Sequence, residues 1–172
     1  MTNQRASGSA EATSETLAIA DRLVAMALPG EQLEAYVASG SSTGVRAYGG
    51  DVESFTQATS AGVGVRVIVG GRQGFASAGT FDETVLMDVL AEARDNAQFA
   101  EPDPHVALAN PDGIVAKPLD LWRDDALELS ADAKIQLALD LEARVRSADP
   151  RITGVRVASY GDSFGERSIA ST

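Results

Sequence analysis

The run Val63-Gly64-Val65-Arg66-Val67-Ile68-Val69 constrains the fold more than any other segment of the chain. Valine recurs at every second position, which is the period of a β-strand that buries one face. Gly70-Gly71 follows directly, and two glycines readily adopt the positive φ angles of a tight hairpin turn. The segment therefore predicts an antiparallel hairpin whose second strand covers residues 73–78.

Further alternating segments indicate that this hairpin belongs to a larger sheet. Gly49-Gly50-Asp51 supplies a second turn between two of them. Short turns between consecutive strands are typical of an antiparallel meander. We therefore expect six or seven strands, which besides the hairpin cover residues 33–38, 45–48, 52–58, 152–160 and 164–172.

Two helices are predicted in this part of the chain, one before the first strand and one after the strand of residues 73–78. The first covers residues 14–28 and ends at Pro29-Gly30. Thr80-Phe81-Asp82-Glu83 is a capping box, with Thr80 as the N-cap of a helix that ends near Phe99. Helical spacing gives each helix one apolar face. The predicted faces are Leu17, Ala20, Val24 and Ala27 for the first helix, and Val85, Leu86, Val89, Leu90, Ala93 and Ala97 for the second.

A third helix follows Ser130 and covers residues 131–147, with the Ser130 hydroxyl as its cap. Its predicted buried stripe is Leu137, Ala138, Leu141, Val145 and Ala148. The fold class is thus α+β, a mainly antiparallel meander sheet packed with about three helices.

The domain organisation follows from composition along the chain. Residues 1–13 show no apolar period and are rich in small and polar residues, so we expect a disordered tail. Residues 14–172 suffice for one domain. Residues 100–128 hold most of the prolines and predict a long irregular connection of the kind that is often functional or interfacial.

Charge and cysteine content exclude several function classes. The net charge is −11, and an acidic chain repels phosphate, so direct nucleic-acid binding is not expected. The absence of cysteine excludes disulfides, thiolate nucleophiles and cysteine-ligated metals. No apolar segment reaches the roughly 20 residues of a membrane span, and the N-terminus lacks the apolar core of a secretory signal. We expect a cytoplasmic protein.

Few residues suggest chemistry. The glycines of Gly62-Val63-Gly64 open a strand and therefore do not make a dinucleotide loop, which joins a strand to a helix. His105 is the only histidine, and beside Asp103 it is a weak acid–base candidate for a cryptic hydrolase. A cation site is conceivable at the carboxylates around Trp122, although their spacing matches no calcium loop. These carboxylates are Asp120, Asp124, Asp125 and Glu128.

The strand arginines and the single tryptophan are the remaining candidates. Strand arginines either protect sheet edges or bind a peptide carboxylate through two hydrogen bonds. Trp122 either anchors the 100–128 loop on the core or binds a ligand. We take Arg66, Arg72 and Trp122 as candidates for peptide or partner contact, and assign no catalytic, cofactor or metal residue. The arginines considered are Arg46, Arg66, Arg72, Arg156 and Arg167.

Three stretches together resemble the N-terminal domain of the TldD/PmbA ("modulator of DNA gyrase") family of metalloprotease-related proteins. They are Gln32–Ala38, then Gly50–Ser54 with Gly62–Ser77, and then Asp149–Ile152 with Ser159–Ser163. The resemblance covers residues 15–172 and is closer to the PmbA (TldE) branch. It implies a C-terminal domain beyond Thr172, which in catalytic members carries an HExxxH helix and a cysteine that bind zinc.

This resemblance implies a role in proteolysis of small or unfolded peptides. The chain would be a non-catalytic domain that contributes to assembly and substrate access, as a homo- or heterodimer with a subunit of the same family. None of the family's metal ligands has a counterpart here, so no catalytic residue is carried over, and we expect Thr172 to be a truncation point. The alternative is a free-standing protein-binding module that uses the proline-rich 100–128 loop.

Overall fold

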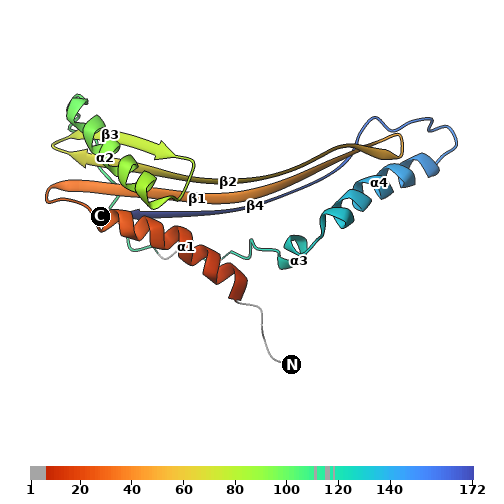
Figure 1. Cartoon of the computed structure of the whole chain (residues 1–172), viewed down its shortest axis with the longest axis horizontal. Helices are drawn as coiled ribbons and strands as arrows, with labels where there is room; N and C mark the ends of the chain where they lie inside the picture. The colour runs from red at the N-terminus through yellow and green to blue at the C-terminus, as the bar shows by residue number, and fades with distance from the viewer. Residues whose placement is uncertain (1–6, 111, 115–116, 118) are drawn as a thin grey trace. The chain divides into compact units, whose positions relative to one another are not determined.

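The computed structural model describes residues 7–110, 112–114, 117 and 119–172. Over these residues the protein is α+β, with four strands in one antiparallel sheet of order β3-β2-β1-β4 and four helices (Figure 1). The fold class is therefore confirmed, and a one-turn helix is added to the three predicted. The elements are α1 Ser7–Val24, β1 Glu31–Tyr48, β2 Asp51–Val69, β3 Arg72–Ala78, α2 Glu83–Phe99, α3 Asp124–Leu127, α4 Ala131–Ser147 and β4 Ala158–Ser171.

The predicted number of six or seven strands is wrong, because predicted neighbours merge into longer strands. Residues 33–38 and 45–48 both lie in β1, and residues 52–58 and 63–69 both lie in β2. Between strands β1 and β2 the chain turns at two glycines with positive φ, Gly49 (69°) and Gly50 (90°), and between β2 and β3 it turns at Gly70 and Gly71. Gly44 and Gly62 lie within strands, where glycine weakens pairing but does not end it.

The residues form two compact units, each containing parts of β1, β2 and β4. Unit 1 comprises Met1–Ser39, Ser60–Pro118 and Gly165–Thr172, and unit 2 comprises Gly40–Thr59 and Leu119–Phe164. α1 begins at Ser7, before the predicted start at Ser14, and residues 1–6 of the predicted tail lie outside the described residues. No described helix is long and apolar enough to cross a membrane.

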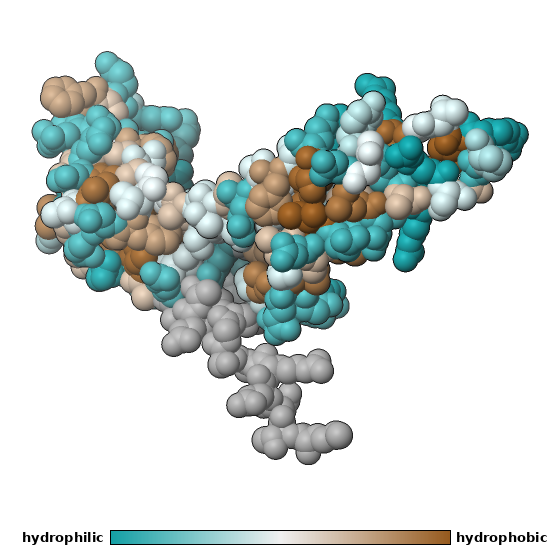
Figure 2. Space-filling model, turned by 45° about the vertical axis from the view of Figure 1, so that its right-hand side comes forward, coloured by the Kyte–Doolittle hydropathy of each residue, from teal (hydrophilic) through white to brown (hydrophobic). Residues whose placement is uncertain are grey.

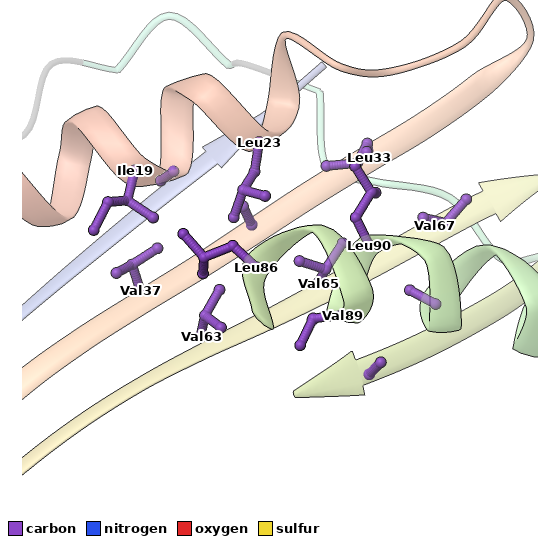
Figure 3. Close-up of a cluster of buried hydrophobic side chains, with 14 residues drawn as sticks. Ile19, Leu23, Leu33, Val37, Val63, Val65, Val67, Leu86, Val89 and Leu90 are labelled. Atoms are coloured by element: carbon purple, nitrogen blue, oxygen red, sulfur yellow. The ribbon is translucent and has the colours of Figure 1, made fainter. Parts of the chain in front are cut away.

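An apolar core holds unit 1 together, and α1, α2 and the strands all contribute to it (Figure 3). Leu33 and Val37 of β1 meet Val65 of β2 in this core, as the period-two pattern predicts. The predicted face of α2 is confirmed. That of α1 is confirmed in part, since Ala20 is fully buried and Val24 and Ala27 pack against the core. Leu17 is instead 40% exposed, and Leu23, which was not predicted, is fully buried. The residues that α1 buries are Thr16, Ile19, Ala20 and Leu23.

The β2–β3 hairpin confirms the strongest sequence prediction. The strands pair antiparallel from Val69↔Arg72 to Val63↔Ala78. Gly74 of β3 is required by packing, since a Cβ there would lie 2.9 Å from the Cα of Ala97 in α2. The missing side chain lets α2 approach the sheet closely.

The capping box predicted at Thr80 is wrong. Asp82 is the N-cap of α2, and its carboxylate accepts from the N–H groups of Thr84 (3.0 Å) and Val85 (3.4 Å). A carboxylate at this position also meets the positive end of the helix dipole, which favours it over a hydroxyl two residues earlier. Glu83 instead pairs with Arg22 of α1 at 2.7 Å.

In unit 2, α4 has the predicted bounds and its predicted cap, since Ser130 Oγ accepts from the N–H of Ala133 (3.2 Å). The predicted buried stripe is wrong except at Ala138, which is buried. Leu137 and Leu141 are 47% and 45% exposed. Apolar side chains accordingly gather on the surface over α4 in Figure 2. The side chains that α4 buries are Lys134, Ala138 and Glu142.

Candidate functional site

Two charged side chains of α4 face inward in unit 2, and each is matched by a partner. Glu142 is 2% exposed, and its two carboxylate oxygens accept from the N–H groups of Gly49 (2.7 Å) and Gly50 (2.9 Å). These are the turn residues of the β1–β2 hairpin. Two charge-assisted hydrogen bonds therefore fix the hairpin turn to α4.

Lys134, one helical turn before Ala138, lies at the centre of a second polar cluster. Its Nζ lies 2.7 Å from Asp162 Oδ2 of β4 and donates to Thr43 Oγ1 of β1 at 3.3 Å. The hydroxyl of Tyr160 also donates to Asp162 Oδ2, at 2.7 Å. The ion pair is nearly buried, with side-chain exposures of 8% for Lys134 and 11% for Asp162.

The cluster controls the protonation of its members. Burial by itself raises the pKa of Asp162, but the hydrogen bonds from Lys134 and Tyr160 outweigh burial, so that the pKa lies below its ordinary value. The same hydrogen bond raises the pKa of Tyr160, because removing the phenol proton would place two negative charges together. At neutral pH the cluster is a satisfied ion pair, which locks α4 to the sheet.

An open pocket of about 650 Å³ lies beside Glu142 in unit 2. α4 supplies most of the lining, and the β1–β2 turn and the segment after α4 supply the rest. The lining residues are Gly50, Gln136, Leu139, Asp140, Glu142, Ala143, Arg146, Ser147 and Ile152. The pocket combines aliphatic side chains with both signs of charge.

The two candidate arginines lie in unit 1, each held by a neighbour. Arg66 of β2 pairs with Glu34 of β1 at 2.7 Å. Arg72 donates to the carbonyl oxygen of Ala100, the C-cap residue of α2, at 2.5 Å. It thereby supplies a hydrogen-bond donor to a carbonyl group at the end of the helix. The bonds explain how the arginines fit the fold, while their contact with a peptide or partner stays a prediction.

Trp122 lies in unit 2, so the structure does not place the three candidates in one unit. Its ring meets Phe164 edge to face, with centroids 5.9 Å apart, and its Nε1 donates to Asp124 at 2.8 Å. This packing is what the anchoring interpretation of Trp122 requires. Among the described residues, no group of three or more histidine, cysteine, aspartate or glutamate side chains could hold a metal ion, and the carboxylates near Trp122 are exposed.

The remaining sequence candidates are exposed. Asp103 accepts from the backbone N–H of His105 at 2.8 Å, which is a local turn contact and does not orient the imidazole. Arg46 pairs with Glu53 across the β1–β2 hairpin, and Arg156 and Arg167 are exposed. None of these contacts assembles an acid–base pair.

Sequence reasoning missed Lys134, Glu142 and the pocket. The available signal was their spacing, because Lys134, Ala138 and Glu142 recur every four residues and therefore lie on one face of α4. The predicted stripe was built from apolar residues of α4, and of these only Ala138 is buried. A charged face of a helix is normally exposed to solvent, and its side chains can be buried only where other groups pair with their charges or hydrogen bond to them.

Two domains of one family match the chain. The sequence of "PmbA/TldA metallopeptidase domain 1" matches residues 33–97, and that of the "PmbA/TldA metallopeptidase central domain" matches residues 124–172. Together they account for most of the chain. The metalloprotease PmbA of Escherichia coli O157:H7 is 27% identical over 123 residues, which are 72% of this chain and 27% of that protein.

Solved structures show the same fold. A protein of Thermotoga maritima titled as a modulator of a DNA gyrase superposes with a TM-score of 0.76 at 19% identity, over 90% of this chain and 35% of that one. TldE from Thermococcus kodakarensis gives 0.71 at 18% identity, over 94% and 35%. The chain thus spans about a quarter of the curated relative and about a third of these structures.

Proposed function

Because this chain belongs to the PmbA/TldD metallopeptidase family, we propose that it forms a non-catalytic N-terminal region of such a protein. In this proposal it contributes to subunit assembly and to the access of small or unfolded peptides during proteolysis. The zinc chemistry would belong to the part of the relatives that this chain does not span, and the partner subunit would be a member of the same family.

The observation that carries this proposal is the edge of β2 in unit 2. β3 pairs with β2 only from Val63 to Val69. Toward Asp51, therefore, β1 is the only neighbour of β2 among the described strands. Residues 53–60 are all exposed. An unpaired strand edge offers backbone N–H and C=O groups to another extended chain.

The composition of this edge fits peptides of varied sequence. Residues 54–60 read Ser-Phe-Thr-Gln-Ala-Thr-Ser and carry no charge. Strand addition draws its affinity from main-chain hydrogen bonds, which every peptide can form, while side-chain pockets supply specificity. A peptide held there would be kept extended, which is the form that a protease cleaves.

The test uses proline, which removes one backbone N–H. Consecutive residues of a strand point their N–H groups to opposite sides, so of Thr56→Pro and Gln57→Pro one variant affects the free edge and the other affects pairing with β1. The probe is a set of fluorescein-labelled unstructured peptides of about ten residues, with binding measured by fluorescence polarisation.

We expect the edge variant to keep its circular dichroism spectrum and to bind peptide about tenfold more weakly. This is the effect of losing one hydrogen bond between uncharged backbone groups and weakening the adjacent ones. The matched controls Thr56→Ala and Gln57→Ala keep both N–H groups and should bind as the unmodified chain does. Equal binding by the folded proline variant and its alanine control would refute peptide capture at this edge.

A further inference from the structure

Beside the face that it buries, α4 has a second face on which apolar side chains stay exposed. Leu137, Leu141 and Val145 recur every four residues and are between 38% and 47% exposed. Ala148, the C-cap residue, continues the series and is also exposed. Such spacing places these four residues in one row along the helix, the apolar row of α4. Scattered exposed apolar residues are normal, but a contiguous row of them indicates an interaction surface.

Two opposite charges lie beside the apolar row. Asp140 and Arg144 are exposed, and each precedes a row residue, whereas the buried residues Ala138 and Glu142 each follow one. At 100° per residue, the two charges therefore lie on the side of the row that faces away from the sheet.

These two charges are not paired with each other, although their spacing of four residues would allow it. Asp140 accepts from Gln136 Nε2 at 2.7 Å. Arg144 takes part in none of the ion pairs that the described residues form. An acid and a base thus remain available beside the same exposed row.

The row and its charges are complementary to a second copy of themselves. When two copies of α4 lie antiparallel about a twofold axis near residues 142–143, Leu141 of each copy meets Val145 of the other, and Leu137 meets Ala148. The same axis brings Asp140 of each copy beside Arg144 of the other. A twofold interface uses one surface patch on both subunits, so a single axis must satisfy every pairing, as it does here.

The charge of the whole chain favours this occupant over a basic partner. Two chains of net charge −11 repel each other, so self-association needs apolar area together with local pairs of opposite charge. The apolar row with Asp140 and Arg144 offers both. A basic partner would be attracted by the whole chain and would be repelled locally by Arg144.

We propose that the apolar row of α4 is a twofold interface between two copies of this chain, with Leu141 at its centre and two Asp140–Arg144 pairs fixing the antiparallel register. The inference rests on the assembly part of the proposed function, for which it names a surface. Two helices in contact over about three turns bury less than the roughly 800 Å² per partner of a standard interface. The dimer is therefore weak and depends on concentration.

The test reverses the charges and measures the dimer by sedimentation equilibrium from about 10 μM to about 1 mM, the range in which weak interfaces dissociate. Asp140→Arg alone and Arg144→Asp alone each place like charges opposite each other at both contacts. Each variant should dimerise at least about tenfold more weakly. Far-UV circular dichroism checks that each variant is folded.

Mixing the two single variants is the decisive measurement. In a mixed pair, two arginines of one chain face two aspartates of the other, so the mixture should dimerise about as tightly as the unmodified chain. The double variant Asp140→Arg with Arg144→Asp should also recover dimerisation. A loss caused by damage to α4 itself would not be repaired by mixing.

Leu141→Gln tests the apolar part of the interface. It should weaken the dimer by about tenfold, because a leucine at the centre of an interface becomes a buried amide without a partner. The matched control is Leu121→Gln, since Leu121 also belongs to unit 2, is 80% exposed and lies outside α4. Equal weakening by the two variants would contradict the proposed interface.

The outcomes also separate this inference from peptide capture. A chain that stays monomeric at about 1 mM, or a dimer that tolerates both single charge reversals, overturns the interface. Fluorescence polarisation measures peptide binding at the β2 edge on the same samples. A monomer that binds peptide refutes self-pairing and leaves edge capture standing, whereas a dimer through α4 that binds no peptide supports the interface and refutes edge capture alone.

Discussion

The two units solve the same problem, attaching helices to a sheet, by different means. In unit 1, α1 and α2 bury leucine, isoleucine and valine against the valines of β1 and β2. In unit 2, α4 buries Lys134, Ala138 and Glu142 and leaves Leu137 and Leu141 half exposed. The first attachment depends on buried apolar area and the second on a few directional polar contacts.

The difference predicts how each unit responds to substitution. Apolar burial is non-directional and roughly proportional to area, so unit 1 should lose stability in proportion to the volume removed. A buried ion pair contributes little more stability than an apolar pair of similar size. Removing only one of its two charges is costly, however, because the other charge is then left buried without a partner. Unit 2 should therefore depend on the pairing of its charges.

Lys134→Met is the largest expected effect. It keeps most of the side-chain volume but leaves the carboxylate of Asp162 buried without its cation, which costs about 3–5 kcal/mol of unfolding free energy. The measurement is denaturant unfolding followed by fluorescence of Trp122, the only tryptophan, which lies in unit 2.

The double variant Lys134→Met with Asp162→Leu is the control for this prediction. Removing both charges should restore most of the lost stability, because apolar replacements of a buried pair are often neutral. If the double variant is as unstable as Lys134→Met, the pairing does not explain the attachment of α4.

Leu86→Ala probes the apolar attachment of unit 1. Leu86 is fully buried in α2, so truncation should cost about 3 kcal/mol through lost burial and a cavity. The matched control is Leu141→Ala in α4, which is 45% exposed and should cost about 0.5 kcal/mol. Far-UV circular dichroism during urea unfolding measures both. Equal losses would mean that the exposed leucines of α4 also carry the attachment.

These comparisons show how far the sequence could predict the fold. The β2–β3 hairpin and the bounds of α2 and α4 were predictable, because Gly70-Gly71, the apolar stripe of α2 and Ser130 are local signals. The merging of predicted strands into longer ones was not predictable. The segments around Gly44 and Gly62 have turn-like composition, and only pairing with neighbouring strands keeps them extended.

The candidate site was less predictable for a physical reason. Hydrophobic periodicity assumes that a buried face is apolar. Glu142 violates this rule because its partners, Gly49 and Gly50, lie more than ninety residues earlier in the chain. Lys134 likewise depends on Asp162 of β4. Burial of a charge is decided by such distant partners, which no local window contains.

Glu142→Gln tests a smaller directional effect. The amide keeps one acceptor oxygen, but its NH₂ group cannot accept from the second glycine N–H, so the unfolding free energy should fall by about 1–3 kcal/mol. Amide hydrogen exchange in residues 45–55 should accelerate more than in residues 63–78. The control Glu128→Gln changes an exposed carboxylate and should leave both segments unchanged. Unchanged exchange near Gly49 in the Glu142 variant would contradict the proposed anchoring of the turn.

The smallest effect appears only in acid and involves one carboxylate in each unit. Burial raises the pKa of Glu31 in unit 1, but the hydrogen bonds from Arg94 (3.0 Å) and the Leu28 N–H outweigh it, so the pKa is lowered, as it is for Asp162 in unit 2. A carboxylate whose folded pKa is depressed stabilises the fold above its unfolded pKa, near 4, and loses that contribution as the pH falls through the folded value.

Stability should therefore stay level from pH 7 to about 5 and decline below about 4. Glu31→Gln and Asp162→Asn should each remove part of this decline, and hydrogen exchange at several pH values assigns the change to a unit. Glu31→Gln should affect residues 31–39, and Asp162→Asn should affect residues 40–59. If both variants change both segments equally, the strands shared by the two units transmit the loss. The contrast between apolar and polar attachment would then describe how the helices are held, but the sheet would unfold as one cooperative element.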